Sequence, residues 1–313
     1  MRYYYKLTIL VILAILVSGE IFMRYALGFC DAVLMRADED YEYIAQPNQE
    51  RYRFMNRIKY NSLSMRSDEI ENGALRVLCV GDSILNGGTF TDQTELATTI
   101  LSYDLSNKLK KKVQVLNISA GSWGPDNEAA YLKKHGTFGA KALVLVTSSH
   151  DARDTMTFIP IVGKLKYFPT KQYPLAWYEL FDRYLSKKST SAWLSKDDAD
   201  AIFKKEHHIE QNSDALNPGF MELKKIADGE RIPLFVYLHP EREELQGSKF
   251  NSFGNEIASF CKREGIHLID GLSQGTTEDC YMAGDYIHLS PAGQRHLASC
   301  LYKHLVEVCT DND

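Results

Sequence analysis

Five short apolar runs, separated by stretches of helical pattern, dominate the chain after residue 70. Each run has the length and the content of β-branched and aliphatic side chains that buried strands show. The runs cover residues 76–80, 113–117, 142–147, 234–238 and 267–270. Because strands that alternate with helices form parallel sheets covered on both faces, residues 71–313 are expected to form one α/β domain.

Capping residues mark where some of the intervening helices begin. Thr91 is expected to cap a helix that ends near Leu109, and Asp126 a helix that ends near Lys134. Ser290 stands directly before a proline, an order typical of the first turn of a helix, so the last helix is expected to begin there.

Residues 1–25 have a different pattern, with two positive side chains before an apolar run at 7–17 that only Thr8 interrupts. The run is shorter than the roughly 20 residues of a membrane-spanning helix and suits the apolar region of a signal peptide. No Ala-x-Ala cleavage pattern follows, however, and the tyrosines at 3–5 can extend the span as an interfacial belt. We therefore expect an uncleaved signal anchor, rather than a cleaved signal of a secreted protein or a buried helix.

The positive side chains also predict an orientation for this anchor. Arg2 and Lys6 precede the apolar run, and positive residues stay on the cytoplasmic side of a membrane. The body of the protein is therefore expected outside the cytoplasm, in the periplasm or at the cell surface.

Two further regions are not explained by the strand-and-helix pattern. Residues 26–70 form a lead segment, of which 58–67 either pack near the active edge of the sheet or serve as a surface connection. Residues 155–217 resemble an insertion rich in aromatic side chains, with helices expected at 175–185 and 196–209. Its aromatics fill a satellite core or form a substrate wall or lid. The adjacent His207 and His208 would point in different directions on a helix, which disfavours a shared metal.

Composition narrows the function classes. The chain has 313 residues and a net charge of −5, with no basic patch, which excludes a nucleic-acid partner. Its six cysteines lack metal-ligand spacing. Cys79 lies in the first apolar run as a small buried residue, whereas Cys300 and Cys309 are candidates for a disulfide in an oxidising compartment.

Four polar segments follow apolar runs, where the carboxyl ends of parallel strands meet at one edge of the sheet. They are residues 81–83 (Gly-Asp-Ser), 117–125, 147–151 and 285–293. In the last segment, Asp285 precedes His288 by three residues and can turn its carboxylate onto the imidazole. The other ring nitrogen then accepts a proton from a serine, for which Ser83 is the candidate.

These four segments resemble, in order, the motif blocks of the SGNH hydrolases, also called GDSL esterases and lipases. The resemblance implies a three-layer α/β/α fold with a flavodoxin-like parallel sheet of strand order 2-1-3-4-5. It also implies hydrolysis of acyl esters, or transfer of the acyl group to another hydroxyl, with no cofactor. In this reading Ser83 is the nucleophile, His288 the base and Asp285 its orienting acid, while Asp82 holds the turn.

The implied oxyanion hole departs from the family pattern at two positions. The backbone N–H of Ser83 is one donor, but the family's glycine falls on Ser122, which serves if its φ is negative. Gly121 is the alternative. His150 stands in place of the family's asparagine, and an imidazole donates a hydrogen bond as an amide does, so we expect a retained donor with altered pH dependence.

Three function hypotheses remain open at the level of the sequence. The first is a membrane-anchored serine esterase or O-acyltransferase that acts on O-acetyl groups of a surface or periplasmic glycan, or on a lipid ester. The second is a non-catalytic carbohydrate-binding or assembly protein that keeps the fold. The third is a metal-dependent hydrolase with His150, Asp151 and Asp154 as ligands, although the motif match accounts for the His-Asp pair without a metal.

Overall fold

A five-stranded parallel sheet forms the centre of the molecule. The computed structural model describes residues 2–186, 211–212 and 214–310. The five strands are β5 (Leu75–Gly81), β6 (Val113–Ser119), β7 (Leu143–Ser148), β10 (Leu234–His239) and β11 (His267–Asp270). They lie side by side in the order β11-β10-β7-β5-β6, and every pair is parallel. When the five strands are numbered 1 to 5 in chain order and the sheet is followed from β6 to β11, the order is 2-1-3-4-5. This confirms the expected fold class.

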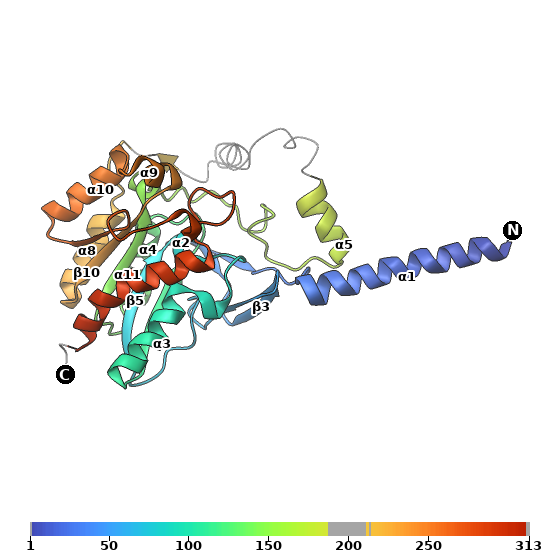
Figure 1. Cartoon of the computed structure of the whole chain (residues 1–313), viewed down its shortest axis with the longest axis horizontal. Helices are drawn as coiled ribbons and strands as arrows, with labels where there is room; N and C mark the ends of the chain where they lie inside the picture. Colours follow the sequence, from blue (N-terminus) through green and yellow to red (C-terminus); the bar gives the residue numbers. More distant parts are fainter. Residues whose placement is uncertain (1, 187–210, 213, 311–313) are drawn as a thin grey trace.

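Helices cover both faces of this sheet (Figure 1). Side chains alternate along each strand, so Val77 and Cys79 of β5 pack into one core while Leu78 and Val80 pack into the other. The first core is closed by α3 (Ala97–Leu109) and α11 (Pro291–Thr310). The second core is closed by helices α4 (Pro125–His135), α8 (Gly219–Glu230) and α10 (Ser252–Arg263).

The helix starts agree with expectation only in part. Ser290 does cap α11, since its Oγ accepts a hydrogen bond from the backbone of Gly293 at 3.1 Å. The Thr91 cap was wrong, because a 3-10 turn, η1 (Gln93–Glu95), capped by Asp92, precedes α3. The Asp126 cap was also wrong, because α4 already begins at the proline before it. Proline fits the first helical position, where its missing N–H has no partner to lose.

Several short elements connect the strands and helices of the body. They are α2 (Ser83–Asn86), η2 (Ser149–Ala152), β8 (Asp154–Thr155), β9 (Gln211–Asn212), α9 (Arg242–Gly247) and η4 (Glu278–Cys280).

The lead segment forms two hairpins on the body. They are built from β1 (Met35–Asp38), β2 (Glu42–Ala45), β3 (Gln49–Arg53) and β4 (Asn56–Tyr60). The residues after β4 run along the edge strand β6, where Arg66 N donates to Asn117 O at 2.9 Å and Asn117 N donates to Ser67 Oγ at 2.8 Å. This segment therefore packs on the body and covers an exposed sheet edge.

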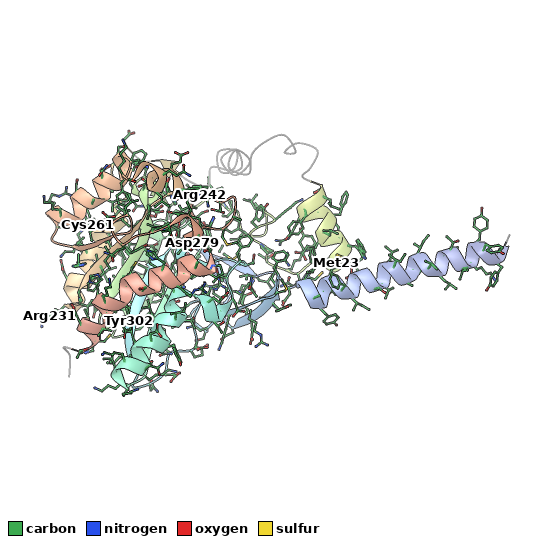
Figure 2. All side chains as sticks on the ribbon, viewed as in Figure 1. Met23, Arg231, Arg242, Cys261, Asp279 and Tyr302 are labelled. Carbon is green, nitrogen blue, oxygen red and sulfur yellow. The ribbon has the colours of Figure 1, made fainter. Side chains whose placement is uncertain are left out.

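Helix α1 (Arg2–Leu27) extends from the body, with Met23 near the junction (Figures 1 and 2). Its segment Tyr3–Leu27 contains an 18-residue window with a mean hydropathy of 2.2, of which only 6% is buried. By length and composition it can cross a membrane, and a signal sequence passes the same test. The helix is much longer than the apolar run at 7–17, because Gly19, Glu20 and Arg24 do not interrupt it.

The helix expected at 175–185 is present as α5 (Ala176–Glu179), continued by a π-helical stretch, η3 (Leu180–Leu185). The expected helix at 196–209, with His207 and His208, lies outside the described residues, as does Trp193. The satellite-core interpretation was wrong for several aromatics of the insertion, whose side chains are exposed. These are Phe158, Tyr167, Trp177, Tyr178 and Phe181, whereas the ring of Tyr184 packs against Phe29 and Phe54.

All six cysteines are free thiols, so neither Cys300 nor Cys309 is part of a disulfide, contrary to the suggestion from the sequence. Burial raises the pKa of both thiols. Cys79 is fully buried in β5, as expected for a small apolar residue.

Candidate active site

The turn after β5 presents Ser83 as the first residue of α2. Asp82 caps this short helix, since its Oδ1 accepts a hydrogen bond from Ile84 N at 2.8 Å. Gly81 is required at the end of the strand, because a Cβ there would lie 2.8 Å from the carbonyl oxygen of Val146. Gly87, at φ 71°, ends the helix. The Gly-Asp-Ser sequence thus builds the turn that exposes the serine.

Ser83, His288 and Asp285 form a continuous hydrogen-bonded relay. Ser83 Oγ lies 3.0 Å from His288 Nε2, although 205 residues separate the two. His288 Nδ1 lies 2.9 Å from Asp285 Oδ2 and 3.0 Å from Oδ1. Burial raises the pKa of Asp285, but hydrogen bonds and the charge of His288 outweigh it, so the net pKa is lower than usual. An ionised carboxylate selects the tautomer in which Nδ1 donates and Nε2 accepts the serine proton.

A buried histidine that sequence reasoning missed holds the His288 loop in place. His239 lies at the end of β10, and its Nε2 is 3.0 Å from the carbonyl oxygen of Ile287. Burial lowers the pKa of His239 to about 4, so the ring is neutral and donates this bond. A histidine at the carboxyl end of the fourth predicted strand was the only signal for this role.

The second segment positions α2 through buried amide groups. Asn117 Nδ2 donates to the carbonyl oxygen of Leu85 at 3.0 Å, and Asn86 Nδ2 donates to that of Ser119 at 3.0 Å. Arg66 of the lead segment, fully buried, donates to three carbonyl oxygens around the end of α2. Neither the Asn86 nor the Arg66 contact was apparent from the sequence.

Ser122 contradicts the condition set for it, because its φ is +58° rather than negative. Left-handed backbone favours glycine, since a Cβ there crowds the following carbonyl group. In the family that the chain resembles, a glycine stands at this position. Here a serine adopts the left-handed backbone conformation that favours glycine. Tyr43 supports the turn, donating its hydroxyl to the carbonyl oxygens of Gly121 and Ser122 at 3.0 and 3.1 Å.

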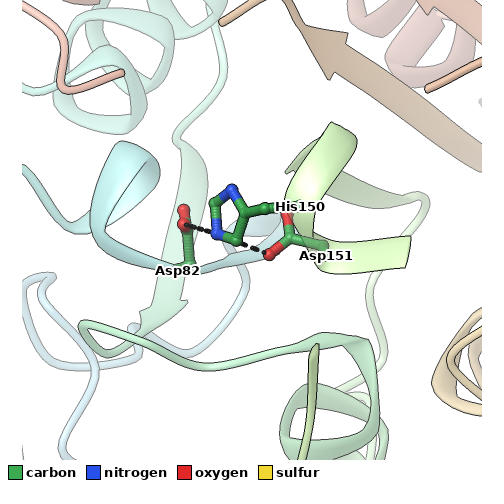
Figure 3. Close-up of side chains that lie close together, drawn as sticks. All are labelled: Asp82, His150 and Asp151. Carbon is green, nitrogen blue, oxygen red and sulfur yellow. Dashed lines mark ion pairs between the residues drawn. The ribbon is translucent and has the colours of Figure 1, made fainter. Parts of the chain in front are cut away.

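His150 lies among three carboxylates at the end of β7. Its Nε2 is 3.1 Å from Asp151 Oδ1 and 3.7 Å from Asp82 Oδ2 (Figure 3). Its Nδ1 is 2.7 Å from Ser148 Oγ and 3.7 Å from Glu241 Oε1. Both ring nitrogens thus have polar partners within the protein, and an oxyanion would share Nε2 with the two aspartates.

Burial shapes the charges around His150. It raises the pKa of Asp82 and of Asp151, and the charge of Asp151 raises that of Asp82 further. Glu241 behaves differently, because hydrogen bonds and charge from His150 outweigh burial and lower its pKa. Glu128 of α4 is wholly buried, and burial, followed by the charges of Asp151 and Asp82, raises its pKa well above the usual range.

Asp82, His150 and Asp151 also form a possible metal-ligand group, with ligand atoms within 4.8 Å of one another. The group differs from the one considered in the sequence, which held Asp154 instead of Asp82. The carboxylates of Asp82 and Asp151 already accept hydrogen bonds within the protein. Asp82 caps α2, and Asp151 Oδ2 accepts from Ser148 N at 2.8 Å and from Thr147 Oγ1 at 2.7 Å. These bonds explain the two aspartates without an ion.

No protein-family model and no curated protein matches the chain. Among solved structures, TesA is 13% identical, with 74% of this chain and 99% of that one covered and a TM-score of 0.45. A lipase/acylhydrolase from Enterococcus faecalis is 11% identical, with 74% and 96% covered and a TM-score of 0.43. A carbohydrate acetylesterase family member from Sinorhizobium meliloti is 13% identical, with 75% and 98% covered and a TM-score of 0.38. At these values the fold rests on the chain's own strand order, and function must be argued from its own site.

Proposed function

We propose that this chain is a serine esterase of the SGNH type that hydrolyses acyl esters with Ser83, His288 and Asp285. The observation that carries the proposal is the relay of 3.0 Å from Ser83 Oγ to His288 Nε2 and 2.9 Å from Nδ1 to Asp285. A serine, a neutral imidazole and an ionised carboxylate in this order are what nucleophilic acyl transfer needs.

The reaction follows from these contacts. Ser83 Oγ attacks the ester carbonyl carbon while its proton moves to His288 Nε2, and Asp285 stabilises the imidazolium. The tetrahedral intermediate collapses, the C–O bond to the alcohol breaks, and His288 returns the proton to the leaving oxygen. Water, or the hydroxyl of an acceptor in a transferase, then attacks the acyl-serine by the same route.

The negative oxygen of the intermediate needs hydrogen-bond donors. We assign this role to the backbone N–H of Ser83, to the backbone N–H of Gly121, since the φ of Ser122 is positive, and to the ring of His150. Each such donor is worth roughly 3 kcal/mol of transition-state stabilisation.

The proposed substrate is an O-acetylated glycan at the cell surface or in the periplasm, with a lipid ester as the alternative. Helix α1, as an uncleaved anchor, would hold the site outside the cytoplasm and near the bilayer, where both substrates occur. Incubating the protein with acetylated glycans and measuring acetate release against acetyl transfer separates hydrolase from transferase.

A fluorophosphonate probe tests the catalytic proposal directly. We expect the probe to label wild-type protein and the exposed-serine control Ser273→Ala, but not Ser83→Ala. Hydrolysis of 4-nitrophenyl acetate should follow the same pattern and should survive a chelator.

The two alternatives give different results in this experiment. A folded wild-type protein that fails to react would favour the non-catalytic binding protein, which His150 and Ser122 suggest. Activity that survives Ser83→Ala but not a chelator would favour the metal-dependent hydrolase.

A further inference from the structure

The α5–η3 segment, residues 175–185, turns its charged side chains inward and leaves several large apolar side chains exposed. Ala176 and Leu180 also face inward, where they pack in a small apolar cluster with Met23 and Phe29. Towards the body the segment places Glu179, which is 0% exposed, and Arg183. Its outward side chains are Leu175, Trp177, Tyr178, Phe181 and Leu185. A surface helix of a soluble domain usually presents a polar face to water, whereas this segment exposes five large apolar side chains.

The inward charges are paired with one another, so this arrangement is built into the fold. Glu179 Oε1 lies 2.6 Å from Arg53 Nη2 and 3.3 Å from Arg183 Nε. Its Oε2 accepts a hydrogen bond from Cys30 N at 2.5 Å. Arg53 also donates to the hydroxyl of Tyr184 at 3.0 Å. Turning the helix over would leave the buried charge of Arg53 without its partner, which is strongly destabilising.

The same segment is attached to α1 through the only acidic side chain of that helix. Glu20 accepts hydrogen bonds from Ala176 N at 2.8 Å and Trp177 N at 3.2 Å, and so caps the start of α5. Arg24 lies 2.6 Å from Glu20 and also donates to the carbonyl oxygen of Pro174 at 2.5 Å. Polar side chains in a membrane helix are costly unless paired, and here the insertion satisfies both.

Trp177 determines where along α1 the start of α5 is attached. Its Nε1 donates to the carbonyl oxygen of Leu16 at 2.9 Å, and its ring lies over Gly19, where a Cβ would come within 2.4 Å. Leu16 is 11 residues before Leu27, or about 16 Å along a helix that rises 1.5 Å per residue. In Figure 1, α5 lies beside the body end of α1 and crosses it steeply.

We propose that the α5–η3 segment lies in the outer leaflet of the bilayer that α1 spans, with its apolar face on lipid. This rests on α1 being an anchor, as in the proposed function, but not on the catalytic relay. If α1 spans the membrane, a segment fixed next to Leu16 and Gly19 lies below the membrane surface, where exposed Phe181 and Leu185 meet acyl chains.

Two membrane contacts, rather than one, would hold the catalytic body in a defined orientation. A single spanning helix leaves the body free to rotate and tilt, whereas a second helix that crosses it steeply restricts both motions. The site would then face the bilayer in the same way in every molecule.

Tryptophan quenching in lipid vesicles tests the placement. The chain has three tryptophans, of which Trp123 is fully buried, so the Trp193→Phe variant of the full chain reports on Trp177. The fluorescence of Trp177 is the part of the emission that is lost when Trp177→Phe is added to this variant. We expect phosphatidylcholine brominated on its acyl chains to quench this fluorescence and aqueous iodide to leave it unchanged. Phe181→Lys should weaken the lipid quenching, whereas Tyr103→Lys, at an exposed position of α3 on the body, should not.

Two results would overturn the proposal. Quenching by iodide instead of brominated lipid would place α5 in water, and protection from both quenchers would mean that protein, such as a second copy of the chain, covers the face. Ester hydrolysis by the same vesicles reports independently on fold and catalytic relay, so either result can be separated from failure of the proposed function.

Discussion

His150 is the residue whose chemistry departs furthest from the motif that the chain resembles. If its ring donates to the oxyanion, His150→Asn should keep activity within about tenfold, because an amide also donates from this position. His150→Leu should lower kcat by about 10²–10³, the usual effect of losing one oxyanion donor. The measurement is kcat for 4-nitrophenyl acetate across the pH range, with a flatter profile expected for His150→Asn. Equal activity of the leucine variant would remove His150 from the oxyanion hole.

Burial of Glu128 should make the free energy of unfolding depend on pH, and Glu128→Gln should remove this contribution. Its pKa is higher in the folded protein than in the unfolded chain, because burial disfavours the carboxylate. The folded state therefore retains a proton that the unfolded chain releases. Its contribution to stability is intact below the unfolded pKa of about 4.3 and falls by about 1.4 kcal/mol per pH unit as the pH rises towards the folded pKa.

We therefore expect Glu128→Gln to gain stability over the wild type as the pH is raised from about 5 to about 7. The measurement is the free energy of unfolding in urea at each pH. Glu243→Gln makes the same chemical change at an exposed position and should show no such gain. Parallel pH profiles for wild type and Glu128→Gln would contradict the prediction.

At the scale of elements, Arg66 joins the lead segment to the nucleophile turn. Its guanidinium is fully buried and donates to the carbonyl oxygens of Asn86, Gly88 and Thr91. Arg66→Met keeps much of the apolar stem but leaves three buried acceptors without this donor, which should cost about 3 kcal/mol or more of unfolding free energy. Because α2 ends at Asn86, kcat should fall as well.

Urea denaturation and ester hydrolysis check this prediction together. Arg66→Lys should recover only part of the loss, since one ammonium group cannot reproduce the planar fork that serves three carbonyl groups. Full recovery by lysine would show that charge alone, and not this set of bonds, holds the loop.

The elements also show where prediction from the sequence ends. The five sheet strands were found to within one or two residues, because runs such as 234–238 are continuously apolar and bounded by polar residues. The β3–β4 hairpin was missed, since its strands are largely polar and its turn is formed by Phe54 and Met55, both with positive φ. Turns of that kind usually contain asparagine or glycine, so the sequence holds no signal for this one.

The same limit applies to the candidate site. Motif order brought Ser83, Asp285 and His288 together in advance, because each lies near a strand end that the topology places at one edge. Ser122 shows what spacing alone does not reveal, since a left-handed φ depends on the packed turn and not on residue type. His239 and Arg66 were missed for a similar reason, because they act through backbone carbonyls that no sequence pattern marks.

At the scale of the whole molecule, the charges that flank α1 predict the side on which the sheet lies if α1 spans a membrane, as proposed above. Arg2 and Lys6 precede the apolar part of α1, whereas residues 28–42 after it contain one positive side chain, Arg36, and five acidic ones. Arg24, near the end of α1, is paired with Glu20. Positive charge therefore favours a cytoplasmic amino end and an external body.

Protease treatment of intact spheroplasts checks this orientation. With the body outside, an epitope tag at the carboxyl end of the chain should be lost, whereas a tag before Arg2 should persist until the membrane is permeabilised. Replacing Arg2 and Lys6 by glutamate should reduce the fraction of molecules in this orientation, because it removes the bias in positive charge. Glutamate at Arg36 is the matched control and should not reduce it. A carboxyl-terminal tag that is protected in intact spheroplasts would place the catalytic body in the cytoplasm, and with it any acyl ester that Ser83 attacks.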